Sequence, residues 1–303
     1  MFITKRINIP EKQLKRLRKY AEVEFVEDDS LDIRKIKPLL KDGDKILAPF
    51  PEPMNWILPG AFLAEIPDLK GVCLSTTSFE WVDGKALRKK GISLTNVPAS
   101  STNAVAEGAI CMMFAVARRF PVIMKQKEFS YIPENLLAEI KGKTAGIIGL
   151  GNIGSRIAQL TDSLGMKVVY WSKKSRNMNY KYLALKKLLK VSDFVFVCLE
   201  MNDKTSNFVS KEEMDLLKKT SSLIDISHRG IVDWKSLVRS VKQGKLYGAA
   251  SDNQENISIS PEDNIFIMPH VNWFTRETLE EKVEVWVDSI ISVIKQKPRN
   301  LVN

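Results

Sequence analysis

An apolar stretch that runs into three glycines constrains the fold of this chain more than any other feature. Residues 144–160 read TAGIIGLGNIGSRIAQL, with Gly149, Gly151 and Gly154 in G-x-G-x-x-G spacing. The apolar run predicts a strand and the following residues predict a helix, which is the context in which this spacing binds a dinucleotide. The first glycine allows a tight turn, the second lets the backbone approach a pyrophosphate, and the third lets the helix pack against the strand. A glycine-rich turn without a ligand is the alternative.

Strands and helices alternate on both sides of this turn. Residues 144–272 carry six apolar strand candidates, enough for a complete doubly wound parallel sheet. The segments between them have helical spacing and predict helices, among them 181–192 and 210–219. Residues 45–97 alternate in the same way and predict a second parallel sheet. Residues 102–127 predict a long helix that Pro121 interrupts. The tail KPRNLVN is too short for a domain, so we expect it to return to the first sheet.

The composition fits a globular chain of two domains. It has 303 residues, of which 44% are hydrophobic and 27% are charged. No apolar run approaches the roughly 20 residues of a membrane span, and no signal-peptide pattern opens the chain. Cys73, Cys111 and Cys198 lack C-x-x-C spacing and are expected to be buried, reduced thiols, which favours the cytoplasm.

The formal net charge is +10 at pH 7. The lysines are spread along helical segments together with glutamates, so we interpret most of them as solvated surface. An anionic small ligand such as a phosphorylated cofactor is the next interpretation. We expect no nucleic-acid partner, because no helix combines clustered arginines with a recognition motif.

The strand after the glycine turn indicates which dinucleotide binds. An NAD site usually has Asp or Glu at the end of this strand, where it holds the ribose 2′-hydroxyl. Here the strand ends VVYWSKKSR, which places Ser172 at that position and Lys173, Lys174 and Arg176 after it. A hydroxyl and cations suit a 2′-phosphate, so the sequence predicts NADP(H). A basic surface loop on an NAD(H) protein is the alternative.

Both histidines of the chain follow predicted strands. His228 and Arg229 come after SLIDI, and His270 comes after IFIMP. Ligands of doubly wound sheets bind beyond the carboxyl ends of the strands. These side chains are therefore candidate site residues, although a structural histidine is the ordinary interpretation of either one.

At this point the sequence resembles the D-2-hydroxyacid dehydrogenase family over nearly its whole length. The resemblance is carried by GISLTNVPASSTNAVAEGAI, KGKTAGIIGLGNIGSRIAQL, LLKKTSSLIDISHRGIVD, LYGAASD, IFIMPHVNWFTRETLEE and the terminal NLVN. It implies an α/β fold of two domains, each a doubly wound parallel sheet. In the implied arrangement, a Rossmann-type NAD(P)-binding domain, residues 98–274, would be inserted into a flavodoxin-like substrate domain, residues 1–97 and 275–303. It also implies hydride transfer between a nicotinamide and a 2-keto or D-2-hydroxy acid, and a homodimer.

The resemblance also implies roles for individual residues. His270 is similar to the family's acid/base, which donates a proton to the substrate oxygen and is kept charged by a carboxylate. Backbone N–H groups near Thr77 and Ser78 would meet the substrate carboxylate. The implied cofactor-binding residues are Gly149, Gly151, Asn152, Ile153, Gly154, Ser172, Lys173, Lys174, Arg176, Leu199, Thr205 and Asp252. No metal is implied.

Several positions depart from the family pattern. Without gaps, His228 falls where the substrate-binding arginine belongs, whereas a one-residue bulge would restore Arg229 there. Only arginine offers two parallel donors to a carboxylate, so both residues stay candidates. The family's catalytic glutamate position is Ile257 here, which leaves Glu255 as the candidate partner of His270 and Glu262 as a weaker one. Gly108 stands where the family often has His.

Two functions are compatible with these residues. The leading hypothesis is an NADPH-dependent reductase of small 2-keto acids such as glyoxylate or hydroxypyruvate. The alternative is a dinucleotide-binding regulatory or interaction protein of the same fold with weak or lost catalysis. His270 and the nucleotide-binding features favour the enzyme, whereas the displaced arginine and glutamate favour the alternative.

Overall fold

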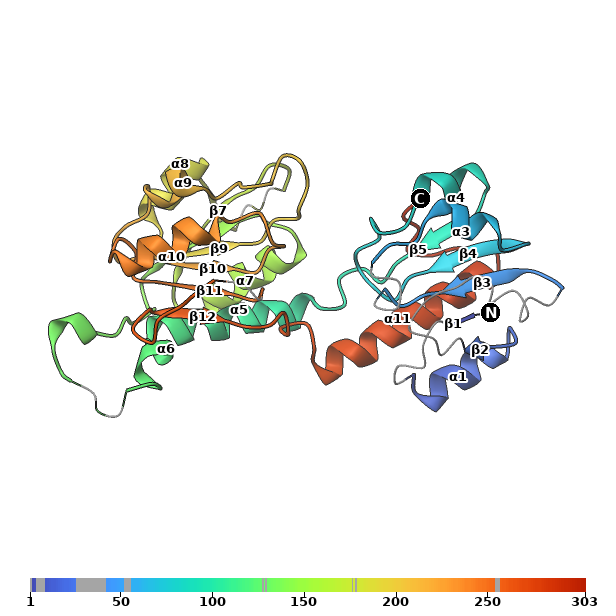
Figure 1. Ribbon diagram of the computed structural model, residues 1–303, viewed down its shortest axis with the longest axis horizontal. Coiled ribbons are helices and arrows are strands. Elements are labelled where there is room, and N and C mark those ends of the chain that lie inside the picture. The colour runs from blue at the N-terminus through green and yellow to red at the C-terminus, as the bar shows by residue number, and fades with distance from the viewer. Residues whose placement is uncertain are drawn as a thin grey trace. The chain divides into compact units, whose positions relative to one another are not determined.

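The computed structural model describes residues 2–3, 9–25, 42–51, 56–126, 128, 130–175, 177, 179–253 and 257–303. Contacts divide the chain into two compact units (Figure 1). The terminal unit comprises Met1–Ser100 and Arg276–Asn303, and the central unit comprises Ser101–Thr275.

The central unit is built on a parallel sheet with seven strands among the described residues, in the order β12-β11-β10-β9-β6-β7-β8. The strands are β6 (Thr144–Ile148), β7 (Lys167–Trp171), β8 (Lys181–Tyr182), β9 (Phe194–Val197), β10 (Ser222–Asp225), β11 (Gly248–Ser251) and β12 (Ile265–Ile267). The chain crosses to one side of β6 and then to the other, as in a doubly wound nucleotide-binding sheet. The predicted fold class is confirmed.

The sequence pattern does not predict one of these strands, β8. It predicts a single helix over residues 181–192, but the segment forms the edge strand β8 and then the helix α8 (Leu185–Val191). The Leu183 N–H donates to the Tyr170 carbonyl at 2.9 Å, and the rings of Tyr170 and Tyr182 pack edge to face. These contacts with β7 hold the first residues of the segment extended.

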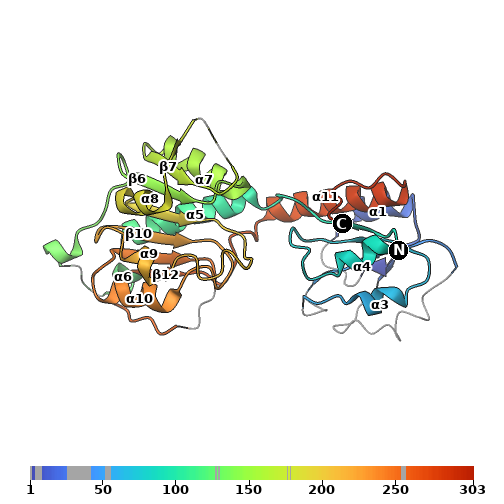
Figure 2. The same cartoon turned by 90° about the horizontal axis from the view of Figure 1, so that it is seen from above.

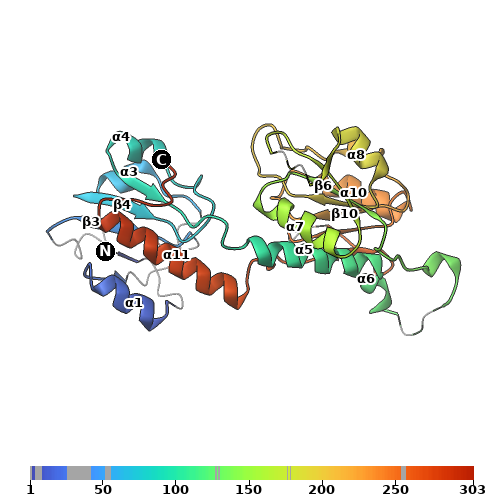
Figure 3. The same ribbon diagram turned by 180° about the vertical axis from the view of Figure 1, so that it is seen from behind.

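Helices cover both faces of the central sheet. Figure 3 shows α5 (Thr102–Ala117) and α7 (Asn152–Ser163) together on one face. The opposite face carries α8, α9 (Lys211–Met214) and α10 (Trp234–Lys242). The predicted helix over 210–219 ends at Met214, and the predicted helix over 102–127 is divided into α5 and α6 (Phe120–Ile123).

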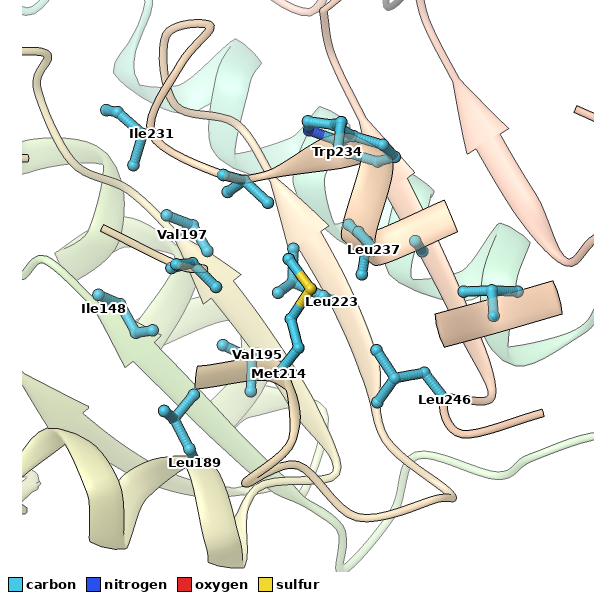
Figure 4. Packing of buried hydrophobic residues seen from close by; sticks show 14 of the residues in the cluster. Ile148, Leu189, Val195, Val197, Met214, Leu223, Ile231, Trp234, Leu237 and Leu246 are labelled. Carbon is cyan, nitrogen blue, oxygen red and sulfur yellow. The ribbon is translucent and has the colours of Figure 1, made fainter. Parts of the chain in front are cut away.

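Alternate residues of the strands supply the two cores of this unit. Val195 and Val197 of β9 belong to the cluster beside α8, α9 and α10, which Figure 4 shows around Leu223 and Met214. Phe194 and Phe196 of the same strand point into the cluster beside α5 and α7. Because both faces are buried, the strands are continuous apolar runs, which is why the sequence identified them readily.

The terminal unit has a parallel sheet with five strands among the described residues, in the order β2-β1-β3-β4-β5. The strands are β1 (Phe2–Ile3), β2 (Glu24–Phe25), β3 (Lys45–Ala48), β4 (Leu69–Cys73) and β5 (Ser93–Thr95). This strand order is that of flavodoxin-like folds, in agreement with the predicted class.

Both chain ends contribute to the terminal unit. Figure 2 shows α1 (Glu11–Arg18) beside α11 (Arg276–Ile294) on one face, with α3 (Gly60–Ala64) and α4 (Gly84–Lys89) on the other. Trp286 of α11 is 1% exposed, and its indole N–H donates to the Cys73 carbonyl at 2.7 Å. The tail follows β5, with the Val302 N–H bonded to Leu94.

The cysteines are free thiols. Burial raises the pKa of Cys73 to about 12, so this thiol stays protonated. Cys111 is exposed on α5, and the prediction that it would be buried is wrong. In the part of the chain that the structure describes, no helix is long and apolar enough to cross a membrane.

Candidate active site

The glycine turn between β6 and α7 has the geometry that the sequence predicts. Gly149 adopts a φ of +97°, and a Cβ on it would lie 2.6 Å from the Cys198 carbonyl oxygen. A Cβ on Gly154 would lie 2.0 Å from the Gly149 carbonyl oxygen. Both positions therefore require glycine, the first for its backbone conformation and the second for the close approach of the helix to the turn.

Gly151 differs from its two neighbours because it faces open space. No protein atom lies within 4 Å of a Cβ built on it. Gly151 is also the N-cap of α7, and no side chain caps the helix. Asn152 is exposed and Ile153 is half-buried in the first turn. Uncapped N–H groups at the start of a helix suit a pyrophosphate, so these residues fit a dinucleotide.

The end of β7 carries positive charge and no carboxylate. Ser172 is buried, and its hydroxyl accepts a hydrogen bond from the Ser175 N–H at 3.1 Å. Lys173 and Lys174 are exposed, and the sequence has no Asp or Glu from 167 to 192. Arg176 lies outside the described residues.

The loop after β9 passes beside the glycine turn. A Cδ atom of Leu199 would lie 2.9 Å from a Cβ on Gly149. The Thr205 hydroxyl donates to the Glu200 carbonyl at 2.6 Å and accepts from the Asn202 N–H at 2.8 Å. In this structure Thr205 therefore serves to hold the loop itself together.

A buried carboxylate organises the end of β10. Asp225 accepts hydrogen bonds from the Ser227 hydroxyl, from the Ser227 N–H at 3.0 Å and from the Trp234 indole N–H at 2.8 Å. His228 and Arg229 follow as exposed residues, before Gly230 at a φ of +86°. Among the residues described here, neither side chain makes a hydrogen bond or an ion pair, so both are available to a ligand.

His270 lies beyond β12, next to the end of β11. Its Nδ1 is 3.2 Å from the backbone oxygen of Asp252. A carbonyl oxygen can only accept, so Nδ1 is the donor and Nε2 is the nitrogen left to exchange a proton. His270 is exposed and has a φ of +59°, a conformation that costs a non-glycine residue energy and is retained where surrounding contacts determine it.

Asp252 holds the loop that carries His270. Its side chain is 4% exposed, and its carboxylate accepts from the Val271 N–H at 3.0 Å and the Asn272 N–H at 3.2 Å. Burial raises the pKa of Asp252, while the two N–H groups and the charge of His270 act in the opposite direction. The predicted carboxylate partner of His270, Glu255, lies outside the described residues, and Glu262 is exposed.

The loop after β4, in the terminal unit, is fixed by its own side chains. The Thr77 hydroxyl donates to the Val97 carbonyl at 2.8 Å, and the Ser78 carbonyl accepts from the Trp81 indole at 3.0 Å. Within the described part of the chain, the backbone N–H groups of Thr77 and Ser78 make no hydrogen bond. They can therefore bind an anion such as a carboxylate.

Sequence reasoning missed Asp225 and Asn272, which shape the turns that carry the candidate residues. Asp225 is 1% exposed at the end of an apolar strand. Because a buried carboxylate needs several hydrogen bonds, an Asp that closes a buried strand is a signal for such a turn. Asn272 gives no comparable signal, because it packs against Gly108, which is distant in the sequence.

Residues 110–273 match the family described as D-isomer specific 2-hydroxyacid dehydrogenase, NAD binding domain. The chain belongs to this family. A glyoxylate reductase of Korarchaeum cryptofilum is 27% identical, with 100% of this chain and 95% of that protein covered. A glyoxylate reductase of Thermofilum pendens is 31% identical, with 78% and 76% covered. The solved structure of an acyclic imino acid reductase with NADPH and D-Arg is 25% identical, with a TM-score of 0.83 and both chains fully covered.

Membership of the D-isomer specific 2-hydroxyacid dehydrogenases places the chain among the oxidoreductases that use a nicotinamide dinucleotide. The substrate is a small keto or hydroxy acid. The alternative of a regulatory protein that has lost catalysis is not favoured, because three relatives that match the whole chain are named as glyoxylate reductases.

Two glycine variants separate dinucleotide binding from folding. Gly151→Ala places a methyl group in open space, so it should leave the melting temperature unchanged. It should weaken NADPH binding about 10- to 100-fold, because the methyl group keeps the pyrophosphate from a backbone N–H and one hydrogen bond to a charged group contributes about 1.5–3 kcal/mol. Gly154→Ala should lower the melting temperature as well, because overpacking costs about 1–3 kcal/mol. Thermal unfolding and fluorescence titration with NADPH measure both effects, and unchanged NADPH affinity in Gly151→Ala would contradict the assignment.

Proposed function

We propose that this protein is an NADPH-dependent reductase of small 2-keto acids such as glyoxylate or hydroxypyruvate. The observation that carries the proposal is the hydrogen bond of His270 to the Asp252 carbonyl, which leaves Nε2 for proton transfer at the same edge of the sheet as the glycine turn. The relatives named as glyoxylate reductases support the substrate class.

The proposed mechanism assigns one task to each group of residues. The glycine turn with Gly149, Gly151 and Gly154 would hold the dinucleotide, and its nicotinamide would supply a hydride for the keto carbon when bound. His270, as the imidazolium, gives the proton on Nε2 to the keto oxygen as negative charge develops there, and is left with its proton on Nδ1. Glu255 is proposed to favour the charged form of His270 through its negative charge, since the Asp252 carbonyl already accepts from Nδ1. The N–H groups of Thr77 and Ser78 bind the substrate carboxylate, which fixes its orientation.

Arg229 and His228 compete for the remaining task, which is to bind the substrate carboxylate and keto oxygen. A guanidinium donates two parallel hydrogen bonds to a carboxylate, whereas an imidazole donates one in a given direction. We propose Arg229 as the contact and retain His228 as the alternative. Both side chains are exposed next to the Gly230 turn, which supports either assignment.

The proposed preference for NADPH rests on the end of β7. The cations Lys173, Lys174 and Arg176 follow Ser172, and no carboxylate is present to repel a 2′-phosphate. The NADPH complex of the similar imino acid reductase supports this preference.

The proposal extends to the domains and the assembly. The central unit would bind the cofactor and the terminal unit the substrate. A homodimer is supported by apolar side chains that follow α5 and are exposed, among them Met124 (82%), Tyr131 (95%) and Leu136 (70%). Light scattering measures the mass of the assembly.

The reductase activity is tested by following NADPH oxidation against a panel of 2-keto acids. We expect turnover of glyoxylate or hydroxypyruvate, and a loss of about 10²–10⁴-fold in His270→Ala, the usual contribution of a general acid. The variant should bind NADPH as the wild type does. Tight NADPH binding without turnover of any keto acid in the wild type would contradict the proposal.

The cofactor preference is tested by replacing Lys173 and Lys174 together with alanine. The ratio of kcat/KM for NADPH to that for NADH should fall about tenfold, and less at high salt, because ions screen exposed charges. The same replacement of Lys186 and Lys187, exposed on α8, is the matched control and should leave the ratio unchanged. An equal ratio in all three proteins would exclude the proposed role of these lysines.

Separate alanine variants of Arg229 and His228 identify the substrate contact. The residue that binds the carboxylate should raise KM for the keto acid by about 10²-fold when removed, since two charge-assisted hydrogen bonds are lost. We expect this of Arg229→Ala, with only partial recovery in Arg229→Lys. A large rise in His228→Ala alone would assign the task to His228.

A further inference from the structure

A glycine inside helix α5 lies against the loop that carries His270. Glycine within a helix costs about 1 kcal/mol relative to alanine, so Gly108 calls for a reason in packing. A Cβ on Gly108 would lie 2.2 Å from Cγ and 2.3 Å from Oδ1 of Asn272. These distances are shorter than any real contact of a Cβ. The side chain of Asn272 can occupy its place only because residue 108 has none.

Packing against Gly108 holds the Asn272 side chain in this place more than hydrogen bonds of its amide nitrogen do. The residue is 6% exposed. Its Nδ2 is buried and has no hydrogen-bond partner among the residues that the structure describes. A buried polar group without a partner costs about 1–3 kcal/mol. A buried polar group without a partner is retained in a protein where the position of its side chain serves another purpose.

The backbone of Asn272 is joined to His270 through Asp252. The N–H groups of Val271 and Asn272 donate to the Asp252 carboxylate, at 3.0 Å and 3.2 Å. The backbone oxygen of Asp252 accepts from Nδ1 of His270, at 3.2 Å. Residues 270–272 are therefore fixed at both ends. The imidazole of His270 fixes one end, and the side chain of Asn272 fixes the other.

We propose that Gly108 and Asn272 are positioning residues for His270. The Asn272 side chain fills the space that Gly108 leaves and so holds residues 270–272 in place. As a result, Nδ1 of His270 stays bonded to the Asp252 carbonyl and Nε2 stays free. This inference rests on the proposed function, in which His270 transfers the proton. According to this inference, helix α5, which is distant from His270 in the sequence, controls the orientation of the His270 imidazole.

Variants of Gly108 and Asn272 test whether the contact between these two residues positions the loop. Gly108→Ala should displace Asn272 and disturb the loop. Asn272→Ala combined with Gly108→Ala removes the colliding atoms and should restore it. Gly248→Ala is the matched control, since its Cβ would lie 2.5 Å from Val116 of the same helix and 2.6 Å from Nδ2 of Asn264. These contacts are at the amino ends of β11 and β12, at the opposite edge of the sheet from His270. Gly248→Ala should lower stability without affecting the loop. If Gly108→Ala does not fold, the single variant Asn272→Ala tests the same contact, because it only removes atoms.

The first measurement does not depend on activity. The chain has two histidines, so the ¹⁵N and ¹³C signals of the His270 ring can be assigned by comparison with His228→Ala. We expect the Nδ1–H tautomer in the wild type, altered ring signals in Gly108→Ala or Asn272→Ala, and wild-type signals in Gly248→Ala. The double variant should return toward the wild type. Unchanged signals in Gly108→Ala and Asn272→Ala, or a double variant no closer to the wild type, would overturn the inference.

The second measurement is kinetic. In Gly108→Ala the kcat should fall about 10- to 100-fold, as expected for a catalytic group misplaced by about 1 Å, with the KM for NADPH unchanged. The double variant should recover most of the loss. If the ring signals respond as expected but the wild type reduces no keto acid, the proposed function fails and the positioning contact stands. If the wild type is active and the kcat of Gly108→Ala is unchanged, the contact has no role in catalysis.

Discussion

A backbone hydrogen bond joins the two strand ends on which the candidate site depends. The N–H of Asp252 donates to the carbonyl of Asp225 at 3.1 Å, at the point where β11 and β10 end. Each aspartate then uses its buried carboxylate to shape the turn that follows. One turn presents His228 and Arg229, and the other fixes the loop of His270. The register of two parallel strands thus determines where the candidate side chains lie.

Most of the fold could be predicted from the sequence, because strands buried on both faces are apolar runs that a simple pattern detects. The glycine turn was equally informative, since Gly149 and Gly154 are required by contacts within one strand and one helix. The strand β8 could not be found in this way. Its two residues are held extended by Tyr170 of a neighbouring strand, and no local pattern encodes that contact.

The candidate site was predicted less completely, for a physical reason. The sequence pattern favours a carboxylate beside His270, and the candidate Glu255 lies outside the described residues. The partner of Nδ1 that the structure describes is the backbone oxygen of Asp252. Every residue carries a carbonyl, so its position cannot be inferred from side-chain types. The contact of Gly108 with Asn272 was hidden for a similar reason, because it joins segments that are adjacent only in the folded chain.

The central claim is that the chain directs a hydride from NADPH to one face of a 2-keto acid. It is tested most directly with hydroxypyruvate and NADPH that carries deuterium at the transferred position. Mass spectrometry and chiral chromatography of the product should give D-glycerate with deuterium on C2. A product of the L configuration, or one without deuterium on C2, would contradict the claim.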